Sequence, residues 1–394
     1  MHHGKYVFAQ VMETLVLYDF NKCVDRYNGH RAIKILSCHD QFRALSFGQL
    51  CYRESLRDVI TCLCAQRAKL YHLGFRSTPT RSTLAEANEK RDWRIYRDFA
   101  ELLIAEAKRC YADDPAFTLD LDGSCYVIDS TSIALCLATF PWAPYMQTHM
   151  QEKGAVKLHL LVDLHGSIPT FFHMTSGKVP DVYFLDRIVF EAGAYYVMDK
   201  GYHDYARFYA IHKAGAFFVT RAKDNMGFVR LYSHACDTSG GLRCDQVIRL
   251  SGVVARKRYP DTLRRIKYYD EETDRYYVFL TNNFTVPAQT IADLYKHRWQ
   301  IELFFKWIKQ HLKIKTFWGH SQNAVQMQIC IALCTYLIVA ILKKRLSIKR
   351  NLYEILQILS VSLFDKTPLV ELFSRVEIQK SDGDTQGTLP LLGI

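Results

Sequence analysis

The sequence predicts an α/β protein: a mixed β-sheet covered by helices, with a β-rich insertion, preceded by an all-helical N-terminal domain. Three observations support this fold class. Apolar residues recur at helical spacing through the first part of the chain. Short apolar runs then alternate with helical segments from Ser124 onward, and strand-like stretches separated by Gly, Asp and Asn follow Arg221. The 394 residues suffice for two or three domains of about 100–200 residues each.

The N-terminal domain is expected to span residues 1–120. Apolar periodicity predicts helices over Val7–Tyr18, Leu45–Leu63 and Leu84–Cys110. A polar turn that contains proline, residues 76–83, precedes the last of these helices, and Ser82 is its expected N-cap.

The helix after that turn is basic, with Lys90, Arg91, Arg94 and Arg97 along it. A basic loop that leads into a basic helix is typical of a helix-turn-helix variant that contacts DNA, in which case Arg91 and Arg94 are contact residues. The same pattern is typical of a solvated helix face with ordinary charge pairs. The sequence leaves both interpretations open.

The α/β domain is expected to comprise residues 121–221 and 286–345. Its predicted strands are Cys125–Ile128, Lys157–Asp163, Ile168–His173, Tyr195–Met198 and Ala216–Thr220. Its predicted helices are Val182–Ala192, Tyr202–Ala214 and a helical region from about Pro287 to about Lys344. Strands followed by alternating helix and strand indicate a mixed sheet with helices packed on it.

A β-rich insertion is expected over residues 222–285, followed after residue 345 by a C-terminal helix and tail, residues 346–394. The predicted strands of the insertion are Gln246–Leu250, Leu263–Tyr269 and Tyr276–Thr281. Basic residues, among them Arg256 and Arg258, alternate with tyrosines there, which predicts contact with DNA.

The net charge indicates the kind of binding partner, and the cysteines indicate the cellular compartment. The net charge of +11 and the pI of about 9.0 favour a polyanion such as nucleic acid, although a basic enzyme without such a partner has the same balance. The apolar run Ile329–Leu342 is too short to span a bilayer, so we expect a buried core helix and no membrane partner. The start of the chain lacks the apolar region of a signal peptide. Twelve scattered cysteines without zinc-site spacing indicate a reducing cytoplasm.

Two carboxylates follow short apolar runs. Asp129 follows Tyr-Val-Ile, and Asp199 follows Tyr-Val-Met. Side chains at the ends of neighbouring strands can meet over the sheet edge, where carboxylates bind Mg²⁺ and pairs of ions catalyse in-line attack at phosphorus. A single aspartate at the end of a strand is also a common turn residue, so neither position is specific alone.

The segment Tyr295–Lys309 is predicted to be one helix, because it contains good helix formers and neither Gly nor Pro. At 100° per residue, one face presents a carboxylate among phosphate-binding groups. The residues of this face are Tyr295, Arg298, Glu302, Lys306 and Lys309. A solvated face with charge pairs is the alternative, but the flanking Trp299 and other aromatic residues are unusual for such a face.

These motifs resemble those of a large family of bacterial insertion-sequence DDE transposases. The signature of that family is Tyr, two residues, Arg, three residues, Glu, six residues and Lys, and Tyr295, Arg298, Glu302 and Lys309 keep every spacing. The contexts of the two aspartates, Asp-Ser-Thr at Asp129 and Asp-Lys-Gly-Tyr at Asp199, also match. The resemblance covers most of residues 120–345.

The resemblance implies a ribonuclease-H-like catalytic domain that performs cut-and-paste transposition. Asp129, Asp199 and Glu302 would bind two Mg²⁺ ions, with Mn²⁺ as a substitute. Tyr295, Arg298 and Lys309 would hold phosphates. In some relatives a tryptophan of the insertion stacks on a flipped base; this insertion has none, so Trp299 or a tyrosine of the insertion is the expected substitute.

The implied partners are the terminal inverted repeats and target DNA, bound as double strands by a homodimer on paired ends in the bacterial cytoplasm, at the nucleoid. Two other readings share these residues. A ribonuclease-H-like structure-specific nuclease would use the same carboxylates without the basic insertion, and a domesticated transposase that only binds DNA would tolerate the loss of a carboxylate. A basic scaffold protein would leave the charged helix face unexplained.

Overall fold

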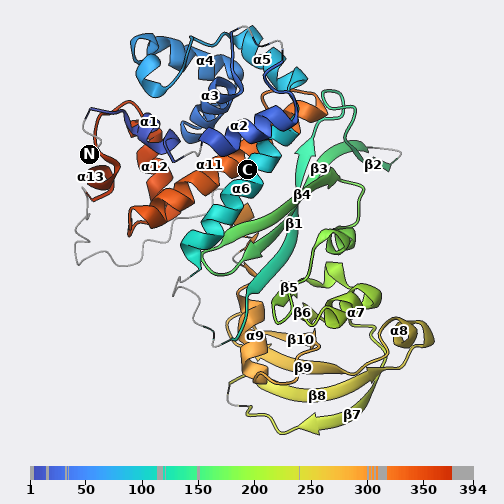
Figure 1. Cartoon of the computed structure of the whole chain (residues 1–394). Coiled ribbons are helices and arrows are strands. Elements are labelled where there is room, and N and C mark those ends of the chain that lie inside the picture. The colour runs from blue at the N-terminus through green and yellow to red at the C-terminus, as the bar shows by residue number, and fades with distance from the viewer. Residues whose placement is uncertain are drawn as a thin grey trace.

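The computed structural model shows a helical layer packed on a long mixed sheet (Figure 1). It describes residues 4–14, 17–31, 33, 35–112, 119, 121–148, 151–238, 240–299, 301–302, 304–305, 308 and 317–374.

The N-terminal region is helical, as predicted. Its helices are α1 (Val7–Met12), α2 (Leu17–Arg26), α3 (Cys38–Leu50), α4 (Leu56–Ala65), α5 (Arg81–Lys90) and α6 (Arg94–Tyr111), with short 3₁₀ turns η1 (Arg67–Lys69) and η2 (Tyr71–Leu73).

All three predicted helices are divided. The first, Val7–Tyr18, ends as α1 at Met12, and α2 begins at Leu17. Residues 45–63 contain a break, because Ser55 begins α4 with a capping box in which its side chain and that of Asp58 satisfy each other's backbone N–H groups. Residues 84–110 are interrupted between Lys90 and Arg94. The prediction of Ser82 as N-cap was wrong, because the Thr80 side chain accepts the N–H of Thr83.

The C-terminal helices complete the same helical layer. They are α11 (Gln322–Arg345), α12 (Leu352–Ser362) and α13 (Leu369–Ser374). Helix α11 packs against α6 and α3, and α6 packs on β4 (Ile168–Ser176). The N–H groups of Val7 and Phe8 donate to the carbonyls of Asp365 and Leu363, so both ends of the described chain meet in this layer.

Helix α11 is long and apolar enough to cross a membrane by length and composition, and it contains the predicted core segment Ile329–Leu342. Ninety-four per cent of its most apolar window is buried inside the protein. The prediction of a core helix is therefore confirmed. One continuous apolar core joins α11, the N-terminal helices and one face of the sheet.

The described strands form one ten-stranded sheet. They are β1 (Cys125–Leu135), β2 (Pro144–Thr148), β3 (Gln151–Asp163), β4 (Ile168–Ser176), β5 (Tyr195–Met198), β6 (Phe217–Arg221), β7 (Phe228–His234), β8 (Leu242–Leu250), β9 (Leu263–Asp270) and β10 (Arg275–Thr281). The order β4-β3-β1-β5-β6 combines antiparallel β4, β3 and β1 with parallel β5 and β6, which is the ribonuclease-H-like arrangement.

The insertion continues this sheet. Strand β10 pairs antiparallel with β6, and β9, β8 and β7 follow in order, so the insertion extends the sheet outward (Figure 1). A short helix, α8 (Val253–Arg258), lies between β8 and β9. Strand β7 and helix α8 were not predicted. In β7 every residue is at least partly exposed, so its sequence lacks the alternation by which a half-buried strand is recognised.

Two helices of the α/β domain differ from the prediction. The segment expected as a helix over Val182–Ala192 is a 3₁₀ turn, η3 (Asp181–Arg187), followed by residues without regular secondary structure. The helix predicted from Tyr202 begins later, as α7 (Tyr205–Lys213), because Asp204 caps it and Lys200–Tyr202 forms a separate turn, η4.

Candidate active site

The register of the three central strands places Asp129, Asp199 and Arg221 side by side. Ile128 of β1 pairs with Met198 of β5, and Met198 pairs with Thr220 of β6. The next residue of each strand therefore lies in one row across the sheet. Strand β5 ends at Met198, whereas β1 continues to Leu135, so Asp129 lies within its strand and not at the predicted end.

Alternation along the strands shows which face these side chains occupy. Val127, Val197 and Val219 belong to the core shared with the helical layer, whereas Ile128 and Met198 belong to the core on the other face. Because side chains alternate between faces, Asp129, Asp199 and Arg221 all face the helical layer. Ile301 and Phe304 are buried in the core of that same face.

Asp129 is mostly buried, with a side chain 20% exposed. Its Oδ1 accepts the backbone N–H of Ser130 over 2.8 Å, and its Oδ2 lies 3.5 Å from Nη1 of Arg298. Burial raises the pKa of Asp129 to about 6; the charges of Asp199 and Glu302 raise it further, while the Ser130 N–H and Arg298 oppose the rise. Burial therefore makes the ionised form of this carboxylate less stable, and a bound cation would stabilise it.

Asp199 is fixed by the turn that follows β5. Its Oδ1 accepts the N–H of Gly201 over 2.7 Å, and its carbonyl accepts the hydroxyl of Thr220 over 3.1 Å. A Cβ at Gly201 would lie 2.9 Å from that Oδ1. The glycine of the Asp-Lys-Gly-Tyr motif thus leaves room for the carboxylate.

Glu302 comes from a helical segment that is distinct from the helix before it. Helix α9 (Ala288–Lys296) ends in a turn at residues 297–298, and helical backbone resumes at Trp299. The prediction of one helix over residues 295–309 was therefore wrong, because the chain turns at 297–298. Glu302 is 56% exposed.

Arg298 links the two carboxylates. Its Nη2 donates to Oε1 of Glu302 over 2.5 Å, while its Nη1 faces Asp129. The Arg298 side chain is only 19% exposed, and its guanidinium lies between acids from separate elements. Arg298 and Glu302 lie side by side, as the predicted shared face requires, and they form an ion pair.

Several donors beside the carboxylates lack a hydrogen-bond partner among the described residues. These buried atoms are the hydroxyl of Tyr295, Nε of Arg298 and Nε of Arg221. The Tyr295 ring packs 4.8 Å from Phe279, which is the register partner of Arg221, so Tyr295 and Arg221 are neighbours. A buried donor without a hydrogen-bond partner lowers the stability of the fold unless a ligand accepts its hydrogen bond.

A groove leads from Asp199 toward the insertion. One cavity of about 580 Å³ is lined by Asp199, Lys200, Gly201, Lys223, Asp224 and Asn225. A second, of about 570 Å³, shares Lys223 and Asn225 and extends to Arg258 on α8. Sequence reasoning missed Arg221 and Lys223. The sequence could have indicated Arg221, because it directly follows the predicted strand Ala216–Thr220, as Asp129 and Asp199 follow theirs.

The donor set fits a divalent cation. Within the described ranges, no group of three His, Cys, Asp or Glu side chains is already arranged around a common metal position. Three carboxylates nevertheless meet here, and the charges of two of them raise the pKa of the third. Carboxylate oxygens are the ligands that Mg²⁺ prefers. Arg298 occupies part of the space between Asp129 and Glu302, so we expect it to shift when the carboxylates share an ion.

The other predicted DNA-binding residues are scattered. Trp299 is 53% exposed next to the site, and Arg256 and Arg258 are exposed on α8. Lys306 and Lys309 lie outside the described residues. Among the insertion tyrosines, Tyr259 and Tyr268 are buried and therefore not available for base stacking.

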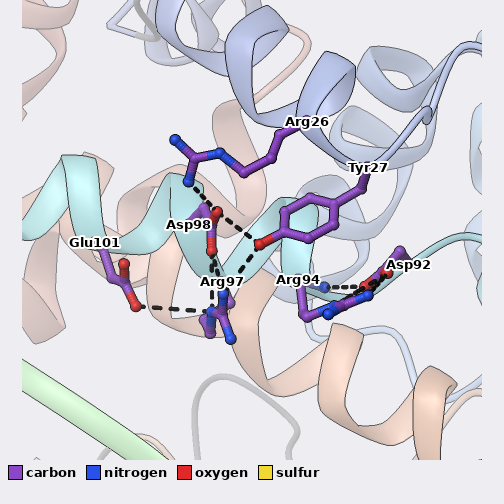
Figure 2. Close-up of polar contacts among 7 residues, drawn as sticks. All are labelled: Arg26, Tyr27, Asp92, Arg94, Arg97, Asp98 and Glu101. Carbon is purple, nitrogen blue, oxygen red and sulfur yellow. Dashed lines mark hydrogen bonds and ion pairs between the residues drawn. The ribbon is translucent and has the colours of Figure 1, made fainter.

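The basic region at the start of α6 is occupied by internal contacts (Figure 2). Arg94 donates to Asp92, and Arg97 donates to the buried Asp98, which also accepts from Arg26 and Tyr27.

Arg91 is held in the same way. It donates to the carbonyls of Leu36 and Ser37 and to Oε1 of Gln41. These contacts favour the charge-pair interpretation of the segment over that of a DNA-contacting helix, because the guanidinium groups of Arg91 and Arg94 already have protein partners.

Comparison with known proteins gives consistent matches. Residues 120–338 match the family model described as "Transposase DDE domain", and residues 3–76 match one described as "Domain of unknown function (DUF4372)". A protein named transposase y4zB, from Sinorhizobium fredii, is 35% identical over 268 residues, which cover 67% of this chain and 72% of that protein.

Two further similarities are weaker. A protein of Geobacillus stearothermophilus named as a transposase for insertion sequence element IS5377 is 28% identical over 65% of this chain and 66% of its own length. A solved piggyBac transposase synaptic complex with hairpin DNA aligns with a TM-score of 0.45 and 11% identity, over 94% of this chain and 80% of that chain. The structural likeness is too low to support an inference.

Proposed function

This chain belongs to the DDE transposase family of metal-dependent DNA-cleaving and strand-transferring enzymes, and we propose that Asp129, Asp199 and Glu302 are its catalytic, metal-binding residues. The observation that supports this assignment best is the placement of the three acids. Two lie in one row of the sheet, and the third is connected to Asp129 by Arg298.

We propose Mg²⁺ as the metal, with Mn²⁺ as a substitute. When bound, the ions activate the attacking oxygen and stabilise the leaving oxygen at phosphorus. Asp129 supplies a carboxylate from a rigid strand, and Asp199 supplies one fixed by the Gly201 N–H. Glu302, which is more exposed, approaches from the helical layer and can adjust its position.

DNA phosphates are the proposed ligands of the unpartnered donors. Arg298 and Arg221 present guanidinium groups, which match phosphate oxygens, and the Tyr295 hydroxyl adds a neutral donor. Lys223 and Arg258 line the groove that leads away from Asp199, so we propose that a DNA strand follows this groove. The net charge of +11 supports a polyanionic substrate.

The proposed reaction is cut-and-paste transposition of an insertion sequence. Water attacks at the element end, and the freed 3′-hydroxyl attacks the opposite strand to form a hairpin and, after the hairpin is opened, attacks target DNA. We propose that two copies of the chain act on paired inverted repeats, in the cytoplasm at the nucleoid. All three acids are retained, which disfavours a derivative that only binds DNA.

A cleavage assay tests the proposal. The purified protein is incubated with labelled DNA from the ends of its own element, with Mg²⁺ or with EDTA. We expect nicking at the 3′ ends that requires the metal and is lost in Asp129→Ala. Glu302→Gln should keep binding to the ends but lose cleavage. Binding without cleavage under any divalent ion would instead support the DNA-binding derivative, and loss of binding in Glu302→Gln would make that residue structural.

A further inference from the structure

A polar cluster lies behind the carboxylates, on the opposite face of the sheet. Its centre is Asp181, whose Oδ1 accepts the hydroxyl of Ser130 over 2.7 Å and lies 3.0 Å from Nζ of Lys157. His159 places Nδ1 3.8 Å from the same oxygen and shares a 2.9 Å hydrogen bond with Thr175 through Nε2. We call Asp181, Lys157, His159 and Thr175 the Asp181 cluster.

The two basic side chains of the cluster are buried, whereas that of Asp181 is 35% exposed. The side chain of His159 is 1% exposed and that of Lys157 is 10% exposed. Lys157 also donates to the carbonyl of Val179 over 2.8 Å, which ties it to the segment just before η3. Burial lowers the pKa of His159 to about 4, so Lys157 is the cation of the cluster at neutral pH. Asp181 is therefore held from two sides.

Ser130 connects the cluster to the active site through the backbone. Its side chain points to the cluster, because Ser130 is one residue away from Asp129 and successive side chains alternate between faces. Its N–H donates to Oδ1 of Asp129 on the other face. The Ser130 residue thus carries one hydrogen bond toward each face of the sheet.

We propose that Asp181 is a positioning residue for Asp129, acting through Ser130, and that it sets the affinity of the site for a divalent metal. The inference rests on the proposed role of Asp129 as a metal ligand. Fixing the Ser130 side chain fixes the plane of the peptide whose N–H holds the carboxylate. Partners that orient a metal ligand typically contribute about 10–100-fold to metal affinity or activity.

Metal binding can be measured without the reaction. The full chain, without DNA, is titrated with Mn²⁺, and the rise in Tm is followed by differential scanning fluorimetry, with the Tm in EDTA as the baseline for folding. The variants are Asp129→Ala, Asp181→Ala, Asp181→Asn, Ser130→Ala and the double variant of Asp181→Ala with Ser130→Ala. Asp186→Ala is the matched control, because Asp186 lies on the same turn, is 51% exposed and pairs with Arg207.

We expect Asp181→Ala to raise the Mn²⁺ concentration for half-maximal stabilisation by about 10–100-fold. Ser130→Ala should do the same, and the double variant should be no worse than either single variant, since both changes break one connection. Asp181→Asn should lie closer to the wild type, because its amide oxygen still accepts from Ser130. If Asp181→Ala does not fold, Ser130→Ala carries the test, because it breaks the same connection.

Two results would overturn the inference in different ways. If Asp129→Ala abolishes the Mn²⁺ effect while Asp181→Ala and Ser130→Ala follow the wild-type curve, the positioning role is wrong and the carboxylate assignment stands. If Asp129→Ala retains the full Mn²⁺ effect, the assignment of Asp129 as a ligand fails, and the role of Asp181 fails with it.

Discussion

Nη2 of Arg298 donates to Oε1 of Glu302 over 2.5 Å, across the first turn of the helical segment that begins at Trp299. Its Nη1 at the same time faces Asp129 at 3.5 Å. A planar guanidinium can contact two carboxylates at once through different N–H groups, whereas an ammonium group is a point charge.

We propose that this guanidinium contacts a DNA phosphate once the carboxylates share an ion. Arg298→Lys should then lower the cleavage rate by about 10²–10³-fold, the scale for losing one positioned donor in a transition state. Binding to element ends should change little, because the positive charge is kept. Single-turnover cleavage and a gel-shift titration of the same preparation separate the two effects. A variant that cleaves at the wild-type rate would show that the fork geometry of Arg298 is unimportant.

Gly201→Ala tests the fixation of Asp199. The new Cβ would lie 2.9 Å from Oδ1 of Asp199, so the carboxylate must move. We expect cleavage to fall by at least about tenfold, because a displacement of about 1 Å can cost 10²-fold in rate. Gly240→Ala is the control, since the atom nearest to its new Cβ is the terminal oxygen of the flexible Gln289 side chain, 3.2 Å away. Equal activity of the two variants would contradict the argument.

Asp129→Asn should stabilise the metal-free protein at neutral pH. The pKa of Asp129 is raised from 3.8 to about 6 in the folded state, so its favourable contribution is present below pH 4 and is lost as the pH rises through 6. The difference amounts to on the order of 2–3 kcal/mol of unfolding free energy above pH 6.

Urea unfolding in EDTA at pH 4 and pH 7.5 measures this difference. The free energy of unfolding of Asp129→Asn should exceed that of the wild type at pH 7.5, and the two should differ little at pH 4. The surface variant Asp186→Asn gives the background change. An Asp129→Asn variant that is less stable than the wild type at pH 7.5 would disprove the burial argument.

Arg221→Ala tests the phosphate contact that sequence reasoning missed. Each neutralised phosphate contributes about −0.9 to the slope of log K against log salt concentration, so the variant should flatten that slope by about 0.9. Arg94→Ala is the matched control, because Arg94 already pairs with Asp92, and it should leave the slope unchanged. The reverse result would place the DNA on the N-terminal helices.

The central strands and the shared position of the two aspartates were predictable, because short apolar runs bounded by turn residues indicate buried strands. Tyr195–Met198 was predicted with its observed bounds. The extension of β1 beyond Asp129 was not predicted, because Ser130–Ser132 are polar and β1 there pairs only with β3. The break at residues 297–298 was also missed, since neither His297 nor Arg298 is a helix breaker by propensity.

The residues of the site that the sequence did not predict are brought there by pairing between strands distant in the chain. Arg221 becomes part of the site only because Thr220 pairs with Met198, a relationship between residues far apart in the chain. Ser130 connects to Asp181 in the same way, across β3 and the turn at η3. Motif spacing identifies residues that share one helix or one turn. Residues that the sheet register brings together can be identified only once the strand pairing is known.

The continuous core between the N-terminal helices and the sheet constrains how this chain can evolve. Two family models divide the chain, at residues 3–76 and 120–338, yet α11 of the second segment is buried against α3 of the first. Recombination that exchanged the first segment between relatives would leave mismatched surfaces around α11. We therefore expect the two segments to be inherited together, and new DNA-end preferences to arise by point substitution and not by shuffling of a detachable module.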